Sequence, residues 1–237
     1  MNSWFGRLGA GGESPRGRKS KARAELPVDR VSIEELAPDA GAVLGQAAYL
    51  QLGWFEALSR AASAAPDLAA KEVLSAAAGR VLAKHTALTE ELTRRSLDPT
   101  AAMSPYREQV DRFLEVSEGA DWHEALSSIY LTSGLLDDFF ARLAGGIPDG
   151  GAAIAEIISR PDGTEVIVEL LTEGQSRNPL LSSRLAVWGR RLVGDTLLVA
   201  RSALTAPRET EERRIEPVLT ELMAEHTRRM DRLGLTA

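Results

Sequence analysis

The chain has 237 residues, a formal net charge of -6 and no cysteine. This length allows one large or two small domains with a core that needs no cross-links. The lack of cysteine excludes thiolate zinc sites, iron–sulfur clusters and cysteine nucleophiles. Aromatic residues make up only 5% of the chain, while Ala, Leu, Glu and Arg are plentiful, which predicts an all-α protein. The acidic balance does not favour nucleic-acid binding by the molecule as a whole.

The N-terminal region differs in composition from the rest of the chain. Residues 1–31 are rich in Gly, Ser and Arg and predict a disordered basic tail. This tail is either a solvated leader or a weak arm for RNA or an anionic membrane. It lacks the apolar region of a signal peptide, and no apolar run approaches the ~20 residues that span a bilayer. We therefore expect no membrane span, a cytoplasmic location and a folded domain over 32–237.

The first helices are marked by their capping residues. Ser32 and Glu35 have the spacing of a capping box, which predicts a helical turn. Asp39 then precedes the first long helix, expected over about 40–64. A proline at the joint introduces the second long helix, about 67–96.

The remaining helices are interrupted by glycine, proline and short polar stretches. The segment 164–172 is rich in β-branched residues, but a single strand would have no pairing partner, so we expect a helix there. The last helix has an apolar stripe and a charged face, so it lies across the other helices or pairs with a second copy in a homodimer. These helices are expected over about 104–117, 121–144, 152–159, 164–172, 179–205 and 209–233, with 100–103 as a bridge.

Four long helices with short connections predict a four-helix bundle with extra short helices and a C-terminal helix. Each long helix carries a polar residue on or beside its apolar stripe. These residues are Gln51 or Glu56, His85, Asp137 or Asp138, and Asp195. The spacing does not decide which member of each pair faces the bundle centre.

These polar residues have two possible explanations. A buried carboxylate costs several kcal/mol unless it is paired or bound to a cation. One explanation is therefore a metal site, to which His85 would contribute a nitrogen ligand. The other is a hydrogen-bonded network, in which His85 is a packed core residue. The network partners would be Tyr49, Tyr130, Arg190 or Arg191.

A complete di-iron centre would need more ligands than the sequence offers. Such bundles take a Glu from each of two helices and Glu-x-x-His from each of the other two. Here Leu82 stands three residues before His85, and Leu198 stands three residues after Asp195. We therefore expect an incomplete set, with iron as the metal if any binds. The candidate ligands are Glu56, His85, Asp138 and Asp195.

Several segments also carry a resemblance to a known family. They are AAYLQLGWFEALSRAA (47–62), HTALTEELTRRSLDPTAAMSPY (85–106), DWHEALSSIYLTSGLLDDFFARLA (121–144), RLAVWGRRLVGDTLLVAR (184–201) and HTRRMDRLGL (226–235). Together they resemble the actinobacterial ferritin-like proteins related to the tRNA methylthio-isopentenyladenosine hydroxylase. The resemblance covers about 40–236 and implies a ferritin-like bundle. The hydroxylase relatives use two irons and oxygen on a modified adenosine near a tRNA anticodon.

The resemblance also implies positions for the family's ligands. Its Glu-x-x-His falls at Leu82 to His85, so the glutamate is lost. Its first-helix glutamate falls near Gln51 or Glu56, one acid falls at Asp138, and its Gly-Glu pair becomes Gly-Asp at Asp195. We therefore expect a non-redox binding or scaffold protein with a degenerate metal site. The alternative is an iron- and oxygen-dependent hydroxylase with tRNA or a small molecule as its partner.

Overall fold

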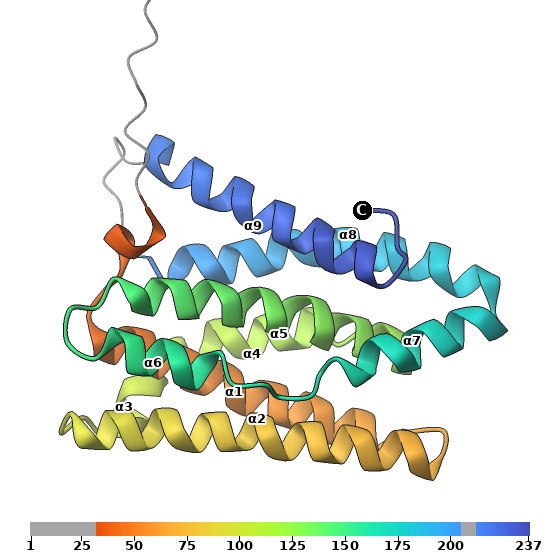
Figure 1. Ribbon diagram of the computed structural model, residues 1–237, viewed down its shortest axis with the longest axis horizontal. Coiled ribbons are helices and arrows are strands. Elements are labelled where there is room, and N and C mark those ends of the chain that lie inside the picture. Colours follow the sequence, from red (N-terminus) through yellow and green to blue (C-terminus); the bar gives the residue numbers. More distant parts are fainter. Residues whose placement is uncertain (1–31, 205–211) are drawn as a thin grey trace, which may run out of the picture.

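The computed structural model describes residues 32–204 and 212–237 (Figure 1). The predicted basic tail, 1–31, lies outside these residues. Throughout the described part the regular structure is helical, which confirms the all-α prediction. The elements are η1 (Ile33–Leu36), α1 (Ala40–Ser63), α2 (Leu68–Arg94), α3 (Pro99–Met103), η2 (Ser104–Tyr106), α4 (Arg107–Val116), α5 (Trp122–Gly145), α6 (Gly151–Ile158), α7 (Val166–Arg177), α8 (Pro179–Ser202) and α9 (Glu212–Arg232).

Most of the expected helices form, and three of the long ones begin after an aspartate. The side chains of Asp39, Asp67 and Asp121 each accept a hydrogen bond from a backbone N–H in the first turn of their helices, where these N–H groups have no partner within the helix. The β-branched segment is helical, as predicted, in α7. The stretch 100–103, expected as a bridge to the next helix, lies in the short helix α3, which Asp98 caps.

Helix α5 lies in the middle of the molecule. The α1–α2 hairpin packs on one side of α5, and α8 and α9 pack on the other (Figure 1). Helices α6 and α7 contact both α2 and α5. As a result, α1, α2, α5 and the α6–α7 connection surround one interior region, while α8 packs on α5 away from α2.

Two glycines of α1 allow α3 and α4 to approach it closely. A Cβ atom at Gly45 would lie 2.2 Å from the backbone oxygen of Ala102 in α3, and one at Gly53 would lie 2.3 Å from Cδ1 of Leu114 in α4. A larger residue at either position would therefore push the short helices away from α1.

Helix α9 covers α5 and α8 with its apolar stripe. Ile215, Val218, Leu222 and Met230 on this stripe are all buried within the chain, and α9 contacts both α5 and α8. The stripe that suggested a homodimer is thus already covered, and the homodimer itself stays a prediction. In the described residues, no helix combines the length and apolar character that crossing a membrane requires.

Candidate functional site

Lys84, in the middle of α2, places its ammonium between two carboxylates. Its Nζ donates hydrogen bonds to Oδ2 of Asp137 on α5 and to Oδ2 of Asp162 in the α6–α7 connection, each at 2.7 Å. The lysine side chain is only 3% exposed, and the two aspartate side chains are 14% and 12% exposed. Charges this far removed from water must compensate one another, because isolated buried charges are strongly unfavourable. We call these three residues the Lys84 cluster.

Neutral groups complete the hydrogen bonding of the Lys84 cluster. Gln51 Nε2 on α1 donates to Oδ1 of Asp137 at 2.6 Å. The backbone N–H and hydroxyl of Thr164 donate to Oδ1 of Asp162 at 3.0 and 2.8 Å. Gln51 Oε1 is buried and has no hydrogen-bond partner among the described residues. The Lys84 cluster and Gln51 together therefore join α1, α2, α5 and the α6–α7 connection, and the Oε1 acceptor of Gln51 lacks a donor among the described residues.

The electrostatics of the cluster give its members different pKa shifts. Burial raises the pKa of Asp137 to about 6 and outweighs the opposing attraction of Lys84. Burial alone lowers the pKa of Lys84, but the attraction of Asp137 and Asp162 raises it above its usual value. Although burial also acts to raise the pKa of Asp162, the Lys84 ammonium and the Thr164 hydrogen bonds hold it below its usual value. Lys84 is thus a cation at neutral pH and a poor nucleophile.

The structure does not gather the four candidate ligands at one place. Glu56 is exposed on α1, and Asp138 is exposed on α5, where it pairs with Arg229 of α9. Asp195 is half-buried on α8, which packs on α5 away from α2. Within residues 32–204 and 212–237, no group of three or more His, Cys, Asp or Glu side chains is placed to hold a metal ion.

His85 lies beside the Lys84 cluster but has a different partner. Its Nδ1 is 2.8 Å from the backbone oxygen of Ala48 on α1. A nitrogen at this distance from a carbonyl oxygen carries the proton and donates it, so Nδ1 has no free lone pair for a metal, whereas Nε2 keeps its lone pair. In this arrangement His85 is an interhelical hydrogen-bonding residue.

The structure also shows which residue faces the interior in each of the two pairs that the sequence left undecided. Gln51 and Asp137 face the interior and bond to each other, whereas Glu56 and Asp138 face solvent. The polar network contains Lys84 as its cation. Its hydrogen bonds to Asp137 come from Gln51 and Lys84, rather than from Tyr49, Tyr130, Arg190 or Arg191.

Sequence reasoning missed Lys84 and Asp162. Lys84 lies three residues after the buried Val81 and four before the buried Leu88, so it fits the apolar stripe of α2 as well as His85 does. The position of this lysine on the apolar stripe was the feature of the sequence that could have indicated its burial. No sequence pattern indicated that Asp162 is buried, because it stands in a Pro-Asp-Gly turn, and such turns ordinarily face solvent.

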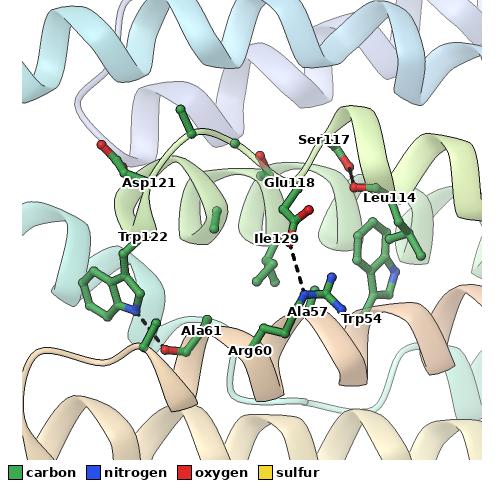
Figure 2. A pocket seen from close by; sticks show the side chains of 15 residues that line it. Trp54, Ala57, Arg60, Ala61, Leu114, Ser117, Glu118, Asp121, Trp122 and Ile129 are labelled. Atoms are coloured by element: carbon green, nitrogen blue, oxygen red, sulfur yellow. Dashed lines mark hydrogen bonds and ion pairs between the residues drawn. The ribbon is translucent and has the colours of Figure 1, made fainter.

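A second feature is a pocket between α1 and the α4–α5 turn, with a volume of about 230 Å³. Figure 2 shows Trp122 and Trp54 at its two ends, with Ala57 and Ile129 between them. Gly119, with a φ of +81°, shapes the turn above it. We call this the tryptophan pocket.

The polar groups around the tryptophan pocket are mostly paired. Trp122 Nε1 donates to the backbone oxygen of Ala61 at 2.9 Å. Arg60 Nε lies 3.4 Å from Oε1 of Glu118, and both of these side chains are more than half exposed. Figure 2 shows this ion pair joining α1 to the α4–α5 turn. The indole N–H of Trp54, which is 2% exposed, has no acceptor in the described part of the chain.

Fold and site together define a helical-bundle protein of the ferritin-like class with a charged interior. The family model of the ferritin-like domain of actinomycetes matches residues 39–210. The match covers most of the chain, so the chain belongs to this family. No curated protein gives a significant match to the sequence. The expected relationship to the tRNA hydroxylase stays a prediction.

Proposed function

We propose that this protein is a non-redox binding member of the ferritin-like family, in which an ammonium group replaces the metal of the bundle interior. The observation that carries the proposal is the position of Lys84 Nζ, 2.7 Å from both Asp137 and Asp162. A side-chain cation that neutralises interior carboxylates removes the electrostatic need for a metal ion there.

The donor set supports the same proposal. Two irons need bridging carboxylates and imidazoles within one cavity. Around Lys84 there are two aspartates, both engaged by the ammonium, and a single imidazole, that of His85. These residues do not fit a di-iron centre.

In the absence of a metal centre, the helical bundle serves as a rigid scaffold for binding. The Lys84 cluster and its partner Gln51 tie three long helices to the α6–α7 connection, so the interior is held by charge-assisted hydrogen bonds. Because its pKa is raised, Lys84 lacks the depressed pKa that an amine nucleophile requires. These properties favour a structural role for Lys84 over covalent catalysis.

The metal content of the protein tests the proposal. The protein would be purified from iron-supplemented cells, and iron, zinc and manganese per chain would be measured by mass spectrometry. We expect a metal content far below one ion per chain, both as purified and after anaerobic loading with Fe²⁺ and desalting. A content near two irons per chain would contradict the proposal and favour the hydroxylase alternative.

A further inference from the structure

We infer that the tryptophan pocket is a binding site for a neutral, planar aromatic molecule of one or two rings. This inference deepens the proposed binding function, on which it rests, by assigning a place and a ligand class to the binding. The pocket is lined by α1, α4, α5 and the α4–α5 turn, and none of the Lys84 cluster or its neutral partners lines it.

The pocket exists because small residues line both of its faces. Ala57 and Ala61 of α1 and its C-cap residue Ala64 follow one another at helical spacing along the pocket. Ala120 of the α4–α5 turn and Ala125 of α5 line its other side. A Cβ is the largest side-chain group that any of these residues supplies. The space between the helices is therefore left open, although its floor is formed by core residues.

The volume of the pocket sets the size of the ligand. An apolar protein cavity of about 150 Å³ holds one benzene molecule. The tryptophan pocket, at about 230 Å³, therefore has room for a two-ring molecule, but it lies below the roughly 300–1,000 Å³ typical of drug-sized ligands.

The walls of the pocket set the chemistry of the ligand. The indoles of Trp54 and Trp122 and the side chains of Leu114 and Ile129 supply apolar and aromatic contact. Aromatic rings favour stacked or edge-to-face contact with other rings, which adds about 0.5–1.5 kcal/mol beyond burial. A flat ring bound in the pocket can make such contact with an indole.

The charges of the pocket favour a neutral ligand. The charged residues that line it already have partners: Arg60 pairs with Glu118, and Asp121 pairs with Arg184. A charged ligand would lose its hydration on entry and find no unpaired charge to replace it. The half-exposed Arg60–Glu118 pair marks the side on which the pocket opens to solvent.

Calorimetric titration with indole tests the inference. We expect saturable binding of one indole per chain, and at least about tenfold weaker binding of indole-3-carboxylate, which has the same rings with a charge. We expect Ala57→Leu and Ala125→Met, which fill the pocket from α1 and from α5, each to weaken indole binding by at least about tenfold. Ala76→Leu, at an exposed position of α2, is the matched control and should leave the affinity unchanged.

Three results would overturn the inference. They are the absence of saturable indole binding to the wild-type protein, equal affinity in the pocket variants and the control, and tighter binding of indole-3-carboxylate than of indole. The first and third need no variant, so they hold even if a substitution disturbs folding. Indole binding together with two irons per chain would reject the proposed function alone, and a metal-free protein without indole binding would reject this inference alone.

Discussion

Replacement of Lys84 by methionine removes the ammonium and keeps most of the apolar chain. The variant would leave the carboxylates of Asp137 and Asp162, which are 14% and 12% exposed, without a counter-charge. Loss of one partner from a buried ion pair typically costs about 3–5 kcal/mol. Because methionine fills nearly the same volume, little of this loss would come from a cavity. We therefore expect Lys84→Met to lower the free energy of unfolding by about 3–5 kcal/mol at pH 7.

The pH dependence of this loss identifies its cause. Without the ammonium, the pKa values of both carboxyls in the folded state would rise above their unfolded values. Such groups stabilise the fold at low pH, and this stabilisation is lost as pH rises through the folded pKa. The deficit of Lys84→Met relative to wild type should therefore be largest at pH 7 and shrink toward pH 5.

Urea unfolding followed by circular dichroism at both pH values would measure the deficit. Lys71→Met, at an exposed position of the same helix, is the matched control and should change stability by no more than about 0.5 kcal/mol. If Lys84→Met cost no more than this control at pH 7, the reasoning about the buried cluster would be refuted.

Three further predictions concern other residues. Asp137→Asn should cost less stability than Asp162→Asn, because burial raises the pKa of Asp137 to about 6. Loss of its charge leaves Lys84 and Asp162 as a neutral ion pair. The reverse order of stabilities in urea unfolding would contradict this prediction. Burial lowers the pKa of His226, so its contribution to stability should fall as pH drops below the unfolded value of about 6.5. Between pH 7.5 and pH 5.5, the free energy of unfolding should therefore fall less in His226→Gln than in the wild-type protein. An equal fall in both proteins would argue against a lowered pKa of His226. Gly45→Ala should destabilise by about 1–3 kcal/mol because its Cβ would meet the backbone of α3. Gly79→Ala, in open space on α2, should stabilise by about 0.5–1 kcal/mol, and equal melting temperatures for the two variants would contradict the packing.

The helices could be predicted from the sequence because their signals are local. An aspartate before each of α1, α2 and α5 caps the helix in the structure, and the apolar periodicity of these helices faces the core. The helical character of α7 also followed from a local reason, since an isolated strand lacks a partner.

The interior cluster could be predicted only in part. Gln51 and Asp137 stood on apolar stripes and do face the interior. Lys84 was missed because Lys84 and His85 both fit the α2 stripe. Their side chains point in different directions around the helix, but the spacing of the apolar residues does not decide which of the two faces the core. Asp162 was missed because its burial depends on how the α6–α7 connection packs on α2, which is a tertiary contact.

The place of Asp195 illustrates the same limit. Its position on the α8 stripe suggested that α8 faces the same interior region as α2. The structure instead packs α8 on α5, away from α2. Amphipathic periodicity indicates which face of a helix is buried, but it does not indicate which neighbouring helix covers that face.

The protonation state of Lys84 tests the central claim most directly. Lysine side-chain NMR of ¹⁵N-labelled protein, compared with Lys84→Met, would assign the Lys84 nitrogen. We expect a protected ammonium signal at neutral pH that persists when Zn²⁺ is added in excess. A neutral amine at that position, or loss of the ammonium signal as Zn²⁺ binds, would contradict the claim that the ammonium holds the place of a metal ion.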